Sequence, residues 1–228
     1  MRLAIADGAD ALEFDVRVSA DGHVVVIHDA TVDRTTDGTG AVERMGLAEL
    51  RRLDAGSRFR PGASGPVTRV KALIPTLDEV LGSFPGIALI IELKSPLSAS
   101  PTRQLIEKHG AEGRCLVDSF SSAALSVFRD SRIASGAGRN GIVRLLAGAL
   151  TRAKSPVPAH VSALAIPRIY HGLPLPVGLI VRTMRSAGKP THVWTVNEPD
   201  EARELWRLGA SGMITDSVPT MLAARDRS

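Results

Sequence analysis

The sequence predicts an α/β fold: a (β/α)8 TIM barrel that lacks its first strand and carries a small insertion after the first β-hairpin. Apolar runs alternate regularly with amphipathic segments from residue 76 onward. Glycine stands at the helix-to-strand junctions at positions 8, 188 and 209. The chain opens with the end of a helix, and seven parallel strands follow. The 228 residues suit one barrel domain, 1–228.

Each element follows from a local pattern. Alternating and β-branched runs predict a hairpin at 11–29 and strands at 87–94, 114–120, 132–135, 162–166, 191–196 and 212–215. Helical spacing predicts helices at 2–7, 47–53, 76–81, 102–109, 122–129, 141–153, 177–187, 200–208 and 218–225. Thr76, followed three residues later by Glu79, forms a capping box. Residues 30–73, rich in Gly, Pro, Ser, Thr and Asp, are expected to form the insertion.

The composition excludes several functional classes. The net charge is +4 and the pI about 9.7, but the basic residues are scattered and aromatic residues make up 4%, which argues against nucleic acid and is compatible with anionic ligands such as phosphate. Cys115 is the one cysteine, so an internal disulfide and a cysteine zinc site are excluded. No apolar run approaches the roughly 18 residues that span a bilayer. We expect a cytoplasmic protein as printed, although an upstream extension could carry an export signal.

The segment from Ala11 to Asp29 gathers polar side chains on one hairpin. Asp21-Gly22 between two β-branched runs is a strong hairpin signal, and a two-residue turn there sets Asp15 opposite His28. Glu13 lies two residues from Asp15 and therefore on the same face. These could be solvent-facing positions of a half-exposed strand. The apolar residues between them already supply one buried face, however, and strands of an α/β fold are usually covered on both.

A second strand offers another acidic residue. In the run 87–94, Glu92 and Lys94 share a face, and both stand at the carboxyl end of the strand, where barrels place their reacting groups. Glu13, Asp15 and Glu92 could converge on a hard divalent cation, with Lys94 beside them as an anion anchor. The alternative is a Glu92–Lys94 ion pair without a metal. Such a pair would place two charges without a function on an apolar strand, where their desolvation costs free energy.

Several motifs, in order along the chain, resemble the glycerophosphodiester phosphodiesterase family. The similarity runs through 7–16 (DGADALEFDV), 21–29, 31–40 (TVDRTTDGTG), 74–77 (IPTL), 91–94 (IELK), 119–120, 193–197 (VWTVN) and 212–216 (GMITD). Several motifs in the right order are far more specific than any one alone. Only about residues 130 to 175 are without such support.

The resemblance implies a metal-dependent hydrolase that cleaves glycerophosphodiesters to sn-glycerol 3-phosphate and an alcohol. It implies that Mg²⁺ or Ca²⁺ is held by Glu13, Asp15 and Glu92, and that His28 and Lys94 are catalytic. Lys94, Trp194 and Phe120 would contact the substrate, with Trp194 against its apolar part. The partner is therefore a small molecule.

One departure from the family pattern concerns the beginning of the chain. The family opens with a strand that ends in His-Arg-Gly, which supplies a second acid/base histidine and a phosphate-binding arginine, and the printed sequence starts downstream of it. We expect a chain whose start site is mis-assigned or which is truly shortened. Two other functions stay open: a remnant that binds a metal or phosphoester without turnover, and a related phosphodiesterase acting on lysophospholipids or sphingolipids.

Overall fold

The structure is a computed structural model, and it describes residues 1–59, 71–151 and 157–226. The strands are β1 (Ala11–Val18), β2 (Val24–Val26), β3 (Ala88–Leu93), β4 (Cys115–Asp118), β5 (Ala134–Ser135), β6 (Leu164–Pro167), β7 (Ile169–Tyr170), β8 (Leu173–Pro174), β9 (Thr191–Trp194) and β10 (Gly212–Met213). The α-helices are α1 (Arg2–Ala6), α2 (Leu47–Leu50), α3 (Leu77–Ser83), α4 (Ala99–Lys108), α5 (Ser122–Ser126), α6 (Arg139–Leu150), α7 (Val177–Ser186), α8 (Pro199–Leu208) and α9 (Val218–Arg225). Short 3-10 turns lie at Val42–Arg44, Pro96–Ser98 and Glu112–Arg114.

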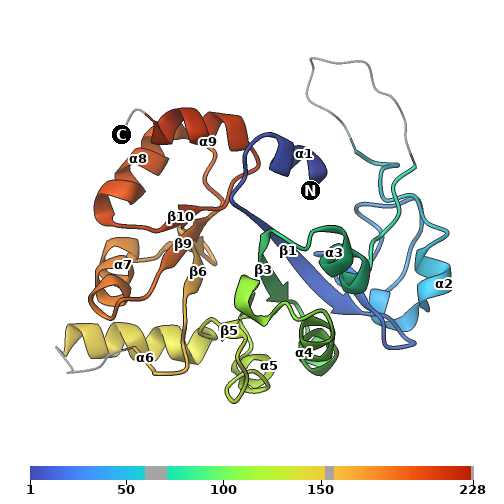
Figure 1. The fold of residues 1–228 in the computed structure, drawn as a ribbon, viewed down its shortest axis with the longest axis horizontal. Coiled ribbons are helices and arrows are strands. Elements are labelled where there is room, and N and C mark those ends of the chain that lie inside the picture. Colours follow the sequence, from blue (N-terminus) through green and yellow to red (C-terminus); the bar gives the residue numbers. More distant parts are fainter. Residues whose placement is uncertain (60–70, 152–156, 227–228) are drawn as a thin grey trace.

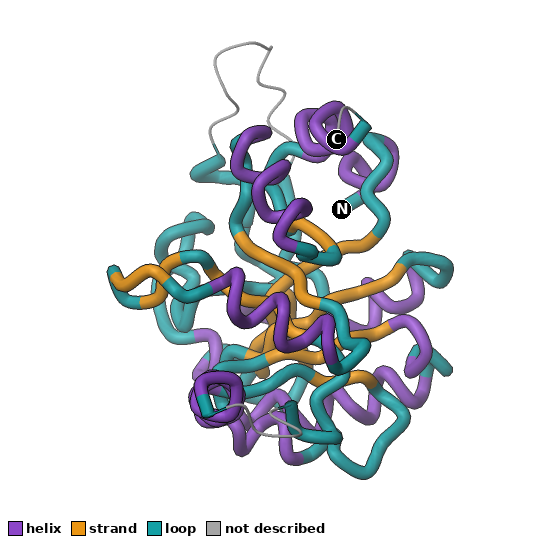
Figure 2. Tube along the Cα trace, turned by 90° about the vertical axis from the view of Figure 1, so that its left-hand side faces the viewer, coloured by secondary structure: helices purple, strands orange, loops and turns teal. Residues whose placement is uncertain are grey.

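Parallel strands form an open barrel with helices around it (Figure 1). One sheet has the order β2-β1-β3-β4-β5, a second has β10-β9-β6, and every pair in them except β1 with β2 is parallel. A hydrogen bond from Ser162 N to Ser135 O, 2.8 Å long, joins the two sheets on the side of β5 and β6. The orthogonal view shows the strands in the middle and the helices outside them (Figure 2). The predicted strand-helix alternation is confirmed.

The strands β1, β3, β4, β6 and β9 bury their outer faces against the helices. The outer residues of β1 and β3 pack in one cluster with residues of α3, α4 and α5: Leu12, Phe14, Val16, Leu89, Ile91, Leu93, Leu77, Val80, Leu81, Ile106, Ala124 and Leu125. Burying one such aliphatic or aromatic side chain stabilises the fold by about 1.5–3 kcal/mol. The predicted capping box begins α3, where Thr76 N donates to Glu79 Oε2 over 2.8 Å and Glu79 N donates to Thr76 Oγ1 over 3.2 Å. A second cluster covers β6 and β9 with α6, α7, α8 and α9.

The predicted register of the first hairpin is wrong by one residue. The structure pairs Val16 with Val26 and Val18 with Val24, and Ser19 N donates to His23 O over 2.9 Å. The loop therefore has three residues, with Gly22 at a φ of 86° in the left-handed region. Such a slip would turn His28 to the opposite face from Asp15 if the strand continued. The ladder of β2 ends at Val26, however, so His28 lies beyond it.

The described part of the predicted insertion packs on the hairpin. Val32, Val42 and Leu50 are fully buried in a small cluster that also contains Val25 and Ile27. Residues 60–70, which the predicted insertion of 30–73 also includes, lie outside the described residues.

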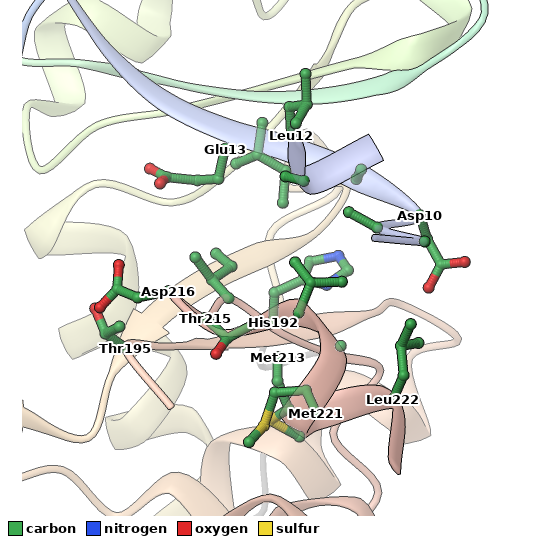
Figure 3. A pocket seen from close by; sticks show the side chains of 18 of the residues that line it. Asp10, Leu12, Glu13, His192, Thr195, Met213, Thr215, Asp216, Met221 and Leu222 are labelled. Atoms are coloured by element: carbon green, nitrogen blue, oxygen red, sulfur yellow. The ribbon is translucent and has the colours of Figure 1, made fainter. Parts of the chain in front are cut away.

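The barrel is open between β1 and β10. In the described residues no strand pairs with residues 11–15 of β1 on the side away from β3, and β10 pairs with β9 alone. A cavity of about 450 Å³ fills this opening, with Glu13 on one wall and His192 and Met213 on the other (Figure 3). The predicted gap in the barrel is thus present where the missing strand would lie.

The segment between β6 and α7 contains an antiparallel hairpin, β7–β8, that the sequence pattern does not predict. Tyr170 pairs with Leu173, and the turn uses His171 at a φ of 49° and Gly172 at 79°. Leu175 N donates to Arg168 O over 2.8 Å and closes the base of this hairpin.

No helix in the described part of the chain has the length and apolar character needed to cross a bilayer.

Candidate active site

The inner faces of three neighbouring strands carry carboxylates at one level of the barrel. Asp15 of β1 is in register with Glu92 of β3, and Glu92 is in register with Asp118 of β4. Residues in register on parallel strands point to the same face, so these three side chains form a row at the carboxyl ends of the strands. Ile90 and Leu116, one level below, pack inside the barrel and form its floor.

Glu13, Asp15 and Glu92 converge as the sequence predicts. Each offers a carboxylate oxygen, and these oxygens lie within 4.8 Å of one another. Asp15 and Glu92 are largely buried, with side chains 19% and 12% exposed. Glu13 faces the cavity between β1 and β10, where its side chain extends toward the same end as Asp216 (Figure 3).

Lys94 bridges two of these carboxylates. Its Nζ lies 2.7 Å from Glu92 Oε1 and 3.0 Å from Asp15 Oδ1, and its side chain is 15% exposed. Burial alone would lower the pKa of Lys94, but the hydrogen bonds and charges of Glu92 and Asp15 outweigh it and raise the pKa. The ammonium is therefore firmly protonated.

Loss of solvation and neighbouring like charges both raise the pKa of Glu13. Loss of solvation is the largest cause, and the charges of Asp15 and Glu92 add to it, so that the pKa of Glu13 rises to about 7 although Lys94 opposes the shift. When all three carboxylates are ionised, they carry two more negative charges than Lys94 balances. A divalent cation would balance them.

His28 reaches the same rim from the end of the hairpin. It lines a cavity of about 330 Å³ together with Glu13 and Asp15, and its side chain is 61% exposed. Its Nδ1 lies 2.7 Å from Asp29 Oδ1, and Arg34 Nε donates to Asp29 Oδ2 over 2.5 Å. These bonds, first that of Arg34 and then that of His28, hold the pKa of Asp29 well below its usual range. Asp29 is thus an anion that orients the imidazole.

Phe120 and Trp194 lie together on the opposite side of the rim. Their ring centres are 6.3 Å apart in an edge-to-face arrangement, and Tyr170 stacks on Phe120 at 5.3 Å. Both predicted substrate-binding aromatics and Glu92 line a common cavity. The structure thus brings together every predicted site residue, with His28 and the aromatics on two sides of the acidic group.

Asp118 lies in the same row as Glu92 but is not among the site residues predicted from the sequence. The pKa of Asp118 is raised to about 8, mainly by desolvation and further by the charge of Glu92. The hydrogen bond that its carboxylate accepts from Ser119 N, 2.8 Å long, opposes this shift. One feature of the sequence could have indicated Asp118. It is the polar residue that ends the apolar run from Cys115, as Glu92 is the polar residue near the end of β3.

His192 points into the barrel and not toward the outer helices. It alternates along β9 with the buried outer residues Thr191 and Val193, and it lines the cavity between β1 and β10 (Figure 3). Desolvation lowers its pKa. It lies at the start of β9, whereas the carboxylate row lies at the ends of its strands.

Comparison with known proteins identifies the family and supports the fold. The sequence model of the glycerophosphoryl diester phosphodiesterase family matches residues 1–220. The chain belongs to this family. A glycerophosphodiester phosphodiesterase of Caldanaerobacter subterraneus subsp. tengcongensis is 30% identical over 226 residues, which cover 94% of this chain and 85% of that protein.

Solved structures agree with the family assignment. A glycerophosphodiester phosphodiesterase from Agrobacterium tumefaciens superposes with a TM-score of 0.73 at 29% identity and covers 97% of this chain and 90% of that one. A phosphodiesterase from Oleispira antarctica, solved in complex with the product sn-glycerol-3-phosphate, gives a TM-score of 0.77 at 25% identity, with 98% and 88% covered. The family predicted from the motifs is confirmed, and it is a family of phosphoric diester hydrolases.

The donor set of this family member fits a hard cation. All three converging groups are carboxylates, the oxygen ligands that Mg²⁺ and Ca²⁺ prefer, and Lys94 leaves their joint charge at the level that a divalent ion neutralises. Asp15 and Glu92 lie on adjacent, hydrogen-bonded strands, which fix the positions of their carboxylates relative to each other. The acidic group can therefore bind a divalent metal.

Proposed function

We propose that this chain is a metal-dependent phosphodiesterase that hydrolyses glycerophosphodiesters to sn-glycerol 3-phosphate and an alcohol. The observation that carries the proposal is the convergence of Glu13, Asp15 and Glu92 around Lys94 at the carboxyl rim of a barrel of this family. The Oleispira relative, which was solved with the product sn-glycerol-3-phosphate, supports the same substrate class.

Glu13, Asp15 and Glu92 would hold Mg²⁺ or Ca²⁺. When bound, such an ion polarises a phosphoryl oxygen and offsets the negative charge that builds up there. Lys94 contributes a fixed positive charge beside the same oxygens, and its two ion pairs keep it in place without further reorganisation. We assign Lys94 to binding the phosphate and stabilising the transition state.

His28 is the proposed proton-transfer group. In hydrolysis the bond from phosphorus to the alcohol oxygen breaks, the departing oxygen takes a proton, and the attacking oxygen loses one. His28 exchanges a proton with one of these two oxygens, which is the usual task of an imidazole near neutral pH. Its exposure on the cavity that it shares with Asp15 leaves room for a substrate. Asp29 orients the ring.

Trp194 and Phe120 are the proposed substrate-binding aromatics. Their edge-to-face contact forms a rigid apolar wall beside Glu92. This wall excludes water from one side of the phosphodiester and contacts its carbon atoms.

Hydrolysis of glycerophosphocholine by the purified 228-residue chain tests the proposal. With Mg²⁺ or Ca²⁺ we expect sn-glycerol 3-phosphate and choline in equal amounts, and no hydrolysis in excess EDTA. Hydrolysis that persists in EDTA would refute the metal dependence. Metal binding in calorimetry without turnover would indicate instead a protein that binds a metal or phosphoester, while choline phosphate or a cyclic phosphate as product would indicate the related lipid phosphodiesterases.

A further inference from the structure

A mainly apolar cavity of about 280 Å³ adjoins the acidic group. Glu92 and Asp118 border it, and the remainder of its lining is largely aliphatic and aromatic: Ile142 and Leu146 of α6, Leu175, Phe120, Tyr170 and Trp194. A phosphodiester bound by Glu92 and Lys94 would therefore direct one of its two substituents into apolar surroundings.

The aromatic wall of this cavity is held in place by local structure. Phe120 is stacked on Tyr170 with an angle of 26° between the rings, and it also meets the ring of Trp194 edge to face. Tyr170 is fixed by the two-residue turn of the β7–β8 hairpin. Because these rings contact one another, the cavity is formed before a ligand arrives, which lowers the entropic cost of binding.

Arg139 competes with a cationic substituent for the aromatic surface of the lining. The guanidinium of Arg139 lies 5.7 Å from the ring centre of Tyr170, on the aromatic surface that a quaternary ammonium group would use. The aliphatic side chains of α6 offer no hydrogen bond to a hydroxylated substituent. An uncharged hydrocarbon group meets neither penalty.

The apolar surface continues beyond the cavity. Val143 lines the cavity and is 60% exposed. Leu173 is 70% exposed and pairs with Tyr170, so it lies on the same face of the hairpin. A hydrocarbon chain longer than the cavity would therefore meet further apolar side chains at its mouth.

We propose that this cavity binds an alkyl or acyl chain, so that the substrates are phosphodiesters with one hydrocarbon substituent. The inference rests on the proposed hydrolysis and names its substrate class. Against the roughly 30 Å³ that one water occupies in the liquid, the cavity volume suits a chain of roughly six to nine carbon atoms. Each methylene that leaves water is expected to improve binding about two- to four-fold.

A chain-length series tests this inference. The methyl, butyl and octyl esters of sn-glycerol 3-phosphate are compared with glycerophosphocholine and 1-octanoyl-glycerophosphocholine, all below their micellar concentrations. We expect kcat/KM to rise at least about ten-fold from the methyl to the octyl ester. The octyl ester and 1-octanoyl-glycerophosphocholine carry their eight-carbon chains on opposite sides of phosphorus, so a preference between them tells which substituent the cavity takes. Equal kcat/KM for short and long chains would overturn the inference and leave the proposed hydrolysis intact.

Two substitutions on one helix provide the matched control. Val143→Asp places a carboxylate in the lining, and we expect it to reduce the octyl-to-methyl ratio of kcat/KM at least five-fold. Leu150→Asp, on the same helix and 75% exposed but outside the lining, should leave that ratio and the activity unchanged. An unchanged ratio in Val143→Asp, with circular dichroism like that of the parent, would count against the cavity as the chain site.

Binding of an inert ligand separates this inference from the hydrolysis itself. Octyl phosphate should quench the fluorescence of Trp194, measured in a Trp206→Phe background, at least ten-fold more tightly than methyl phosphate. If no diester is hydrolysed but this difference is seen, the proposed function fails and the chain site stands. Equal affinity for the two phosphates would refute the chain site whatever the activity.

Discussion

Lys94 Nζ lies 2.7 Å from Oε1 of Glu92, two residues earlier in the chain. Lys94 directly follows β3, and Asp15, in register with Glu92 on β1, places a second carboxylate 3.0 Å from the same ammonium. The lysine thus compensates part of an acidic group that faces the barrel interior. Stability and metal binding should be linked through it.

Replacing this lysine tests the link. Lys94→Met leaves two largely buried carboxylates without their counterion, and we expect a loss of about 1–3 kcal/mol in the free energy of unfolding without metal. A divalent ion should raise the free energy of unfolding of Lys94→Met by more than it raises that of the parent protein. Thermal denaturation with EDTA and with Mg²⁺ measures both. Lys108→Met is the matched control, because its ion pair with Asp78 is exposed and should contribute less than about 1 kcal/mol. Equal losses in both variants would contradict the prediction.

Removing single carboxylate charges should abolish metal binding. Glu13→Gln and Glu92→Gln keep the shape of the side chain but lose an anionic ligand, so we expect affinity for Mg²⁺ or Ca²⁺ to fall at least about ten-fold, with loss of metal-dependent hydrolysis. Isothermal titration calorimetry measures the affinity. Glu107→Gln, an exposed residue paired with Arg103 on α4, should bind metal like the parent. Parent-like affinity in both site variants would remove these residues from the metal site.

His28→Ala should separate proton transfer from metal binding. The imidazole contacts Asp29 and not the acidic group, so metal affinity is expected to stay within about two-fold while kcat falls about 10²- to 10⁴-fold. Steady-state kinetics and calorimetry on the same preparation provide the two measurements. His23→Ala, an exposed position next to the hairpin turn, is the control. Turnover retained in His28→Ala would refute the assigned role.

Cys115 should be unreactive in the native protein. It is 3% exposed at the start of β4, and desolvation raises the pKa of its thiol to about 11, so only about 0.1% is thiolate at pH 8. We expect labelling by a thiol reagent to be at least about a hundred-fold slower in the native than in the urea-unfolded protein. Absorbance of the released thiolate follows the reaction. Equal rates would show that β4 is not packed as described.

The turn of the first hairpin depends on one glycine. Gly22 has a φ of 86°, and Gly22→Ala should reduce the free energy of unfolding by about 1 kcal/mol, because a Cβ is strained in that conformation although the space around it is open. Gly86→Ala has equally open space without a positive φ and should be neutral or slightly stabilising. Urea denaturation of both variants measures the difference. A neutral effect of Gly22→Ala would argue for a different turn.

The parts of the fold that depend on local chemistry could be predicted from the sequence. The capping box at Thr76 and the shared face of Glu92 and Lys94 follow from spacing alone. The hairpin register could not be predicted, because Asp21-Gly22 is compatible with two different connections. One is a two-residue turn, and the other is a three-residue loop that starts one residue earlier. Pairing across strands decides between them.

The missed features have a common cause in long-range packing. Asp118 joins the site because β4 lies in register with β3, and Tyr170 faces the aromatic wall because a short hairpin turns back on itself. In the sequence, Asp118 is an ordinary polar residue after an apolar run, and 167–176 looks like a proline-rich turn. In neither case does the local sequence indicate which distant residues pack against the segment.

The opening between β1 and β10 divides the molecule into two units of unequal protection. β3 and β4 have partners on both sides, whereas β10 has one partner and pairs over two residues. In native-state hydrogen exchange, the amides of β3 and β4 should open only with global unfolding, while those of β10 exchange through a cheaper local opening. β10 is then expected to lose its structure before β3 and β4, and the acidic half of the site stays folded while it does so.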